Sequence, residues 1–253
     1  QLLERACHEV GWDLVQPLTS SSYTGFGHGS LTRDTFELNA LMEYLTHHRN
    51  ADIFAIVGHS TGCQNSIHFL KHGHPHLLQK TKVVALQAPV SDREGAMLEP
   101  GYKENIKQAQ MLVESGKAEE MMPRDAFWAP ITAQRFISLQ DTNGDDDFFS
   151  SDSTDEQMID RLSHVGRVGQ QSGLQLIAAF SGKDEYVPDH VDKEQLLERM
   201  CQAMNNNNHD IDENNKTVAS KLMLHNGNHN LSKGENDAHI FVKAVQEKLK
   251  IHT

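Results

Sequence analysis

The sequence predicts an α/β protein with a mostly parallel sheet that is covered by helices on both faces. Short, nearly continuous apolar segments alternate along the chain with segments whose apolar residues recur at helical spacing. Such apolar segments are typical of parallel strands that are buried on both faces. The length of 253 residues fits one large domain, whose core is big enough to fold without disulfide bonds or a structural metal.

The individual elements follow from these patterns in chain order. We expect strands at residues 12–16, 52–57, 82–86, 174–180 and 217–224. We expect helices at residues 1–9, 34–48, 63–71, 192–204 and 235–250. Pro17 closes the first strand, and Gly73 and Pro75 end the third helix. The Ser- and Gly-rich residues 20–30 and the polar run 205–215 are predicted loops.

Residues 92–172 interrupt the alternation. This stretch contains helical patches near 103–121 and 155–162 and an acidic segment at 141–156. The alternation resumes afterwards and requires the same sheet, so we expect a single domain over residues 1–253 with a cap inserted at about 92–172. A separate small domain in that stretch is the alternative.

Composition excludes several classes of partner. The formal net charge is −12, which argues against a nucleic-acid partner and against docking on anionic lipid. The sequence holds no apolar run of the ~20 residues that a membrane span needs, and we expect no secretory signal. Three scattered cysteines are too few for a disulfide framework and suit a reducing compartment, so we expect a cytoplasmic protein. The chain begins with Gln1, and we expect its true N-terminus to lie upstream.

Gly58-His59-Ser60-Thr61-Gly62 matches the pattern G-x-S-x-G. The motif lies between a predicted strand and a predicted helix, which is the setting of a nucleophile elbow in α/β-hydrolases. A sharp strand-to-helix reversal exposes the Ser60 hydroxyl, and we expect a side chain at Gly58 or Gly62 to clash with its neighbours. The Thr61 N–H opens the following helix, where a free donor and the helix dipole stabilise an oxyanion.

An acid and a base are predicted beyond the ends of later strands. In this fold the chain order is Ser, then Asp or Glu, then His. Asp184 follows the strand at 174–180, and His229 follows the strand at 217–224. We expect His229 to take the Ser60 proton and Asp184 to orient His229. Alternatives are His225 or His59 as the base and Asp92, Asp189 or Glu185 as the acid.

Other residues are candidates for lining the pocket. Tyr23 and the glycines of residues 20–30 form either the pocket mouth or a flexible loop. His59 lies inside the elbow, and Arg93 either anchors the cap or contacts a substrate carboxylate. Cys63 fits a buried position better than the role of a second nucleophile.

Two patterns that suggest a metal are better explained without one. Residues 141–152 resemble a calcium loop, but Asp146 stands where glycine belongs and Asp152 where glutamate is expected. His72, His74 and His76 are interrupted by helix-breaking residues, so we expect surface histidines rather than ligands. No metal site and no cofactor is predicted.

Several motifs together carry a resemblance to a known family. They are residues 58–66, LQAPVSDRE at 86–94, DDDFFSSD at 145–152, FSGKDEYVPDHVDK at 180–193 and GNHNLS at 227–232. Over nearly the whole chain the sequence resembles a poorly characterised eukaryotic α/β-hydrolase family that includes fungal esterases of fusarinine-type siderophores. The resemblance implies the α/β-hydrolase fold, a serine hydrolase mechanism, and Ser60, Asp184 and His229 as the matching triad.

These observations predict a serine hydrolase that cleaves a small-molecule ester through an acyl-Ser60 intermediate and needs no cofactor. The alternatives are a non-catalytic ligand-binding protein on the same scaffold and an acyltransferase. Family members place a second oxyanion N–H in a loop after an early strand. We expect that strand and loop to lie ahead of the first residue of this sequence. The oligomeric state is not predicted.

Overall fold

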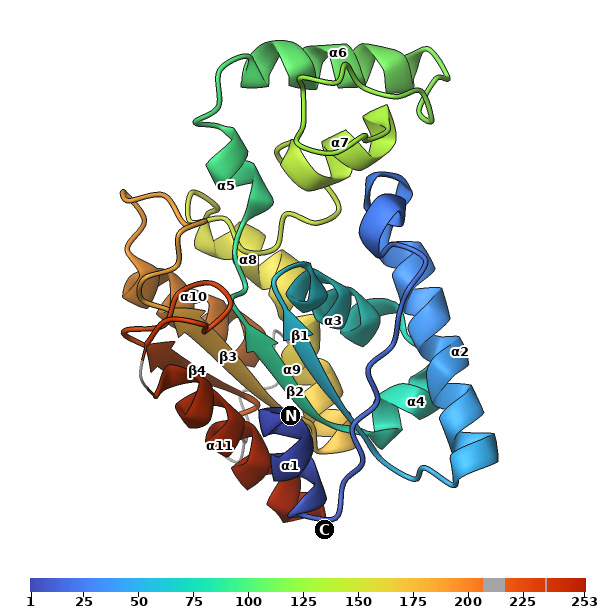
Figure 1. Cartoon of the computed structure of the whole chain (residues 1–253), viewed down its shortest axis with the longest axis vertical. Coiled ribbons are helices and arrows are strands. Elements are labelled where there is room, and N and C mark those ends of the chain that lie inside the picture. Colours follow the sequence, from blue (N-terminus) through green and yellow to red (C-terminus); the bar gives the residue numbers. More distant parts are fainter. Residues whose placement is uncertain (207–216, 235) are drawn as a thin grey trace.

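The computed structural model describes residues 1–206, 217–234 and 236–253. Four strands form a parallel sheet in the order β1-β2-β3-β4 (Figure 1). They are β1 (Phe54–His59), β2 (Thr81–Gln87), β3 (Gln175–Ser181) and β4 (Ala219–Leu224). All four were predicted to within a few residues. Because they are parallel and in register, their carboxyl ends meet at one edge of the sheet.

Alternating residues of each strand face two separate cores. Val84 and Leu86 of β2 join the larger core, whereas Val83 and Ala85 of the same strand join the smaller one. The larger core is covered by α3 (Thr61–His72), α8 (Asp155–Leu162), α9 (His164–Ser172) and α10 (Lys193–Asn205). The smaller core is covered by α1 (Leu2–His8) and α11 (Asp237–Leu249), which ends in the short turn η2 (Lys250–His252).

Two further helices extend the larger core, to which they contribute Leu31, Met42 and Leu77. They are α2 (Leu31–Arg49), which packs on α3, and α4 (Pro75–Lys80), which leads into β2 (Figure 1). The residues just before α2 include a 3-10 turn, η1 (Tyr23–His28), inside the predicted loop. None of the helices in the described ranges is long and apolar enough to cross a membrane.

Residues 92–172, which interrupt the alternation of strands and helices, divide into two parts. The helices α5 (Asp92–Ala96), α6 (Tyr102–Glu114) and α7 (Ala133–Gln140) stand beyond the sheet, and the last two share a small core of their own (Figure 1). In contrast, α8 and α9 belong to the core of the sheet through Met158, Leu162 and Val165. The part that stands apart from the sheet therefore ends near residue 147.

Three of the predicted boundaries are wrong. Residues 12–16 form no strand in the described structure, because no neighbouring segment supplies the hydrogen bonds that a strand requires. The helix predicted over 103–121 ends at Glu114, and residues beyond it turn back toward α7. The polar run predicted as a loop begins inside α10, where Asn205 accepts hydrogen bonds from the Val218 and Ala219 N–H groups; its residues 207–215 lie outside the described residues.

Candidate active site

Ser60 stands at the turn between β1 and α3. Its backbone has φ 52° and ψ −124°, a strained conformation for a residue with a side chain, costing on the order of 1–3 kcal/mol. A hydrogen bond from the Ser60 N–H to the Gln87 carbonyl, 3.0 Å long, holds the turn against β2. Thr61 is the first residue of α3, so its N–H has no acceptor within the helix. The turn thus places a hydroxyl beside a free donor.

The two glycines of the motif play different roles. A Cβ at Gly58 would collide with the Gly62 carbonyl group and lie 2.7 Å from the Ser66 hydroxyl oxygen, so the crossing of strand and helix requires glycine there. A Cβ at Gly62 would meet nothing within 4 Å. The predicted clash at Gly62 is therefore wrong, because a Cβ there would point into open space, although the Gly62 carbonyl lies against the strand.

The structure brings Ser60, His229 and Asp184 into one hydrogen-bonded row. His229 Nε2 lies 2.9 Å from the Ser60 hydroxyl oxygen. On the other side of the ring, Nδ1 lies 2.9 and 3.0 Å from the two carboxylate oxygens of Asp184. Since Asp184 is 3% exposed and acts here as an acceptor, Nδ1 carries the proton and Nε2 is free to accept one from Ser60.

Three further residues hold His229 in place, and of these the sequence pointed only to Glu185, as an alternative acid. The Gln87 side-chain amide donates to the His229 carbonyl at 2.9 Å, and Glu185 accepts from the His229 N–H at 2.9 Å. The ring of Tyr186 meets the imidazole edge-on, with the ring centres 4.6 Å apart. Gln87 ends β2 as a single buried amide in an apolar strand, and its position carries no local sequence signal.

The other histidines take different positions. His59 is exposed and hydrogen bonds through Nδ1 to Gln87, with its ring centre 5.0 Å from that of His229. Desolvation of the ring by neighbouring protein atoms lowers the pKa of His59, against the opposing effect of the Gln87 hydrogen bond. His225 is exposed and lies 3.9 Å from a carboxylate oxygen of Glu194. Neither histidine is recorded in contact with the Ser60 hydroxyl.

Asp92 is a carboxylate beside the row rather than within it. Its Oδ2 accepts a hydrogen bond of 3.2 Å from the Gln64 amide, which stands one turn after Ser60 on α3. Solvent reaches the Asp92 side chain, but desolvation by the surrounding protein raises its pKa to about 6, against the charges of Arg135 and His229. His229 instead hydrogen bonds to the carboxylate of Asp184.

Arg93 is a buried anchor and not a pocket residue. Its guanidinium is 3% exposed and lies 3.0 Å from carboxylate oxygens of both Asp147 and Asp152. Arg135 similarly lies 2.7 Å from Asp146. Three carboxylates of residues 141–152, the segment that resembles a calcium loop, therefore form ion pairs with Arg93 and Arg135.

The loop before α2 is packed rather than open. Tyr23 is 83% exposed, and the structure records no contact of its ring with Ser60 or His229. A Cβ at Gly27 would collide with the Pro130 carbonyl oxygen, and the Gly27 carbonyl accepts the Thr132 N–H at 2.9 Å. This loop therefore fits closely against the chain that enters α7.

Cys63 is fully buried one turn into α3. Its thiol points at the carbonyls of Gln87 and Gly58, at 3.2 and 3.5 Å, and burial raises its pKa. A thiol that is neutral and inaccessible is no nucleophile.

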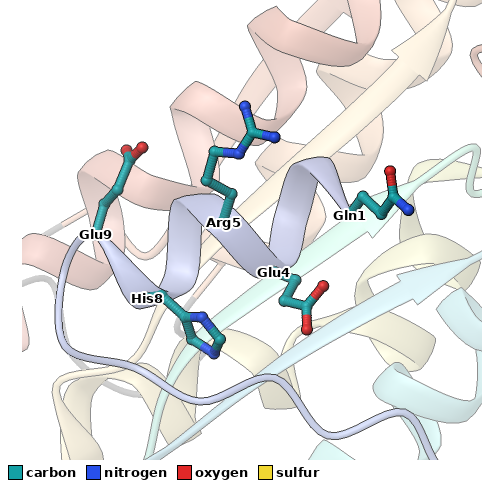
Figure 2. Close-up of a pocket in the computed structure, with 5 residues that line it drawn as sticks. All are labelled: Gln1, Glu4, Arg5, His8 and Glu9. Carbon is teal, nitrogen blue, oxygen red and sulfur yellow. The ribbon is translucent and has the colours of Figure 1, made fainter.

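A surface hollow elsewhere does not compete with this site. It runs along α1 and is lined by Gln1, Glu4, Arg5, His8 and Glu9. Figure 2 shows Arg5 and Glu9 on one side of the short helix and Glu4 and His8 on the other. Without convergent groups the hollow offers no chemistry.

Comparison with known proteins finds a matching family model and similar chains. A family model described as "Protein of unknown function (DUF1749)" matches residues 1–250. The UPF0613 protein PB24D3.06c of Schizosaccharomyces pombe is 36% identical over 223 residues, which cover 81% of this chain and 68% of that protein. Fusarinine C esterase sidJ of Aspergillus fumigatus is 28% identical over 253 residues, covering 81% of this chain and 71% of that protein.

A solved structure agrees with these relatives. The siderophore hydrolase EstB from Aspergillus fumigatus is 27% identical, covers 99% of this chain and 85% of its own, and superposes with a TM-score of 0.73. The predicted resemblance to a family with fungal siderophore esterases is confirmed. The chain has the α/β-hydrolase fold and belongs to the family described as a protein of unknown function, DUF1749.

Proposed function

We propose that this protein is a serine hydrolase that cleaves a carboxylic ester through an acyl-Ser60 intermediate. The observation that carries the proposal is the hydrogen-bonded row from the Ser60 hydroxyl through His229 to Asp184. Nucleophile, base and orienting acid lie within hydrogen-bond reach of one another, which is the geometry that acyl transfer requires. The named esterase and hydrolase relatives support the same class of reaction.

The first half-reaction acylates the enzyme. The Ser60 oxygen attacks the ester carbonyl carbon as His229 Nε2 takes the hydroxyl proton. Asp184 stabilises the imidazolium that forms, and the Thr61 N–H donates to the oxyanion, a type of contact worth about 3–4 kcal/mol of barrier. The tetrahedral adduct then collapses, and His229 returns its proton to the departing alkoxide, which leaves as the alcohol.

The second half-reaction releases the acid. A water molecule gives a proton to His229 and attacks the acyl carbon, and the second tetrahedral adduct expels the Ser60 oxygen, which takes the proton back. Water ends as the added hydroxyl of the carboxylic acid, so the enzyme is regenerated without a cofactor. That the loop of an earlier strand supplies a second oxyanion N–H stays a prediction.

The helices α5, α6 and α7 are proposed to form the cap that selects the substrate. They stand beyond the carboxyl edge of the sheet, where Ser60, Asp184 and His229 meet (Figure 1). Loops and insertions at this edge carry substrate contacts in open α/β sheets. Because similar proteins are named for fusarinine C and for siderophores, fusarinine C is the first ester to test.

Labelling with a fluorophosphonate probe tests the proposal directly. The probe reacts with an activated serine and leaves a stable adduct that peptide mapping locates. We expect one adduct, on Ser60, and no adduct after Ser60→Ala. Ser115→Ala, an exposed serine in the loop after α6, serves as the matched control and keeps full labelling. Folded protein that stays unlabelled, or full labelling of Ser60→Ala, contradicts the proposal and favours a ligand-binding protein.

A further inference from the structure

A second group of chemically active side chains lies away from Ser60. Glu43 on α2 faces His74 and His76, which flank the first residue of α4. Glu43 Oε1 lies 2.6 Å from His76 Nε2 and 3.7 Å from His74 Nδ1. One ligand atom from each of the three residues lies within 4.8 Å of the other two. Two imidazoles and a carboxylate thus converge from segments about 30 residues apart in sequence.

The backbone holds these groups in place. The His74 N–H donates at 2.9 Å to the side-chain oxygen of Asn39, a buried residue one turn before Glu43 on α2. Pro75 fixes the start of α4, between the two histidines. A Cβ at Gly73 would lie 2.7 Å from the Phe69 carbonyl oxygen, so the turn from α3 into α4 allows little freedom. The donor atoms therefore converge because the turn is tied to α2.

The chemistry of the group suits a metal ion. Two imidazole nitrogens approach the same carboxylate oxygen, and one donor atom from each of the three residues lies within 4.8 Å of the others. Imidazole nitrogen and carboxylate oxygen are ligands that Zn²⁺ binds at ~2.0–2.2 Å, and three protein ligands with water in the fourth position make a common zinc arrangement. Small side-chain rotations are enough to bring the three donors around one ion, because the side chains are free to move on the surface. The two imidazoles are more than half exposed, and the Glu43 side chain is 32% exposed.

We propose that Glu43, His74 and His76 form a binding site for a divalent transition-metal ion, with Zn²⁺ as the expected occupant. The site lies near the amino ends of the strands, because α4 leads into the amino end of β2. Ser60 lies at the opposite end, where β1 finishes. Its role is to clamp α2 to the turn between α3 and α4, and it takes no part in ester cleavage. The sequence predicted surface histidines here because Gly73 and Pro75 break the helix, and the third ligand, Glu43, is remote in sequence.

Calorimetric titration of the tag-free, chelator-stripped chain with ZnCl₂ at pH 7.5 tests the site. We expect one equivalent of Zn²⁺ to bind. His74→Ala, His76→Ala and Glu43→Gln should each weaken binding at least about tenfold, because each removes one ligand. His239→Ala removes another exposed histidine and serves as the matched control, since the chain has 16 histidines in all. Its affinity should equal that of the unaltered chain.

Two further readouts compare each protein with and without the metal. Saturating Zn²⁺ should raise the Tm of the unaltered chain and of His239→Ala, but not that of His76→Ala. Co²⁺ in place of Zn²⁺ should give the visible absorption of a four-coordinate site in the unaltered chain. Absence of a saturable one-equivalent event in the unaltered chain overturns the proposal. Unchanged affinity in His74→Ala and His76→Ala overturns it equally.

Discussion

The carboxyl edge of the sheet and the segment from α5 to α7 are held by different forces. At the carboxyl end of the sheet, the strained turn at Ser60 and the close crossing at Gly58 fix the main chain. The Gln87 and Glu185 side chains hydrogen bond there to the main-chain carbonyl and N–H of His229. The outer segment is tied down by charged side chains, with Arg93 and Arg135 buried against carboxylates of residues 146–152.

On the proposed function, this difference separates the reacting groups from the segment proposed to select the substrate. Backbone constraints hold the turn at Ser60, and small misplacements of reacting groups are costly in catalysis. Side-chain ion pairs hold the outer helices in place but leave their exposed surfaces free to vary. The helices α6 and α7 of the outer segment also share a small core of their own, so substitutions there need not alter the packing of the sheet. The predictions below act on one region or on the other.

Asp184→Asn attacks the sheet edge and has the largest expected effect. An amide at this position favours the wrong tautomer of His229, and the equivalent change in a serine protease lowers kcat about 10⁴-fold. Turnover of a p-nitrophenyl ester measures the loss. Asp189→Asn, an exposed neighbour that the sequence left open as the acid, is the control and should stay within about twofold. A small loss in Asp184→Asn together with a large one in Asp189→Asn reverses the assignment.

Arg93→Met attacks the outer segment instead. Removing one partner of a buried ion pair costs about 3–5 kcal/mol, because Asp147 is left buried and uncompensated. Differential scanning calorimetry should show a lower Tm, and limited proteolysis should cut first within residues 92–147. Arg167→Met removes an exposed arginine and should change neither. Cleavage that begins in the sheet would show that the two regions are not held independently.

The sequence predicted what local patterns encode. Four strands, the turn at Ser60 and the order of Ser60, Asp184 and His229 follow from apolar periodicity, glycines and strand ends. The strand predicted at 12–16 failed because local pattern does not show whether a pairing partner exists. Gln87, Glu43 and the pairing of Arg135 with Asp146 were missed for a related reason. Each acts on a residue far away in the chain, and no spacing rule links such pairs.

Gln87→Ala tests the carboxyl end of the sheet and is expected to have a smaller effect. Without the amide, the His229 carbonyl and the His59 ring lose a partner, and the imidazole is less well aligned with Ser60. We expect kcat to fall about tenfold with KM nearly unchanged, because the residue positions the base and does not bind substrate. Gln79→Ala on the exposed surface of α4 is the control. A rise in KM with constant kcat would instead place Gln87 among the binding groups.

Asp92→Asn has the smallest effect and acts where the two regions meet, since Asp92 opens α5 and bonds to Gln64 on α3. Desolvation raises the pKa of Asp92 to about 6 in the folded protein, whereas an unfolded Asp titrates near 3.9. As pH rises from about 4 to 6, the unfolded chain loses this proton first, so the native protein is progressively destabilised. Asn carries no such cost.

The Tm of Asp92→Asn should therefore exceed that of the unaltered protein by on the order of a few degrees at pH 7.5, and the difference should shrink toward pH 4. Ester turnover should stay within about threefold, because His229 pairs with Asp184. A Tm difference that is the same at both pH values would mean that Asp92 ionises normally. A loss of turnover as large as that of Asp184→Asn would make Asp92 the acid, and the orienting carboxylate would then come from the outer segment and not from the sheet edge.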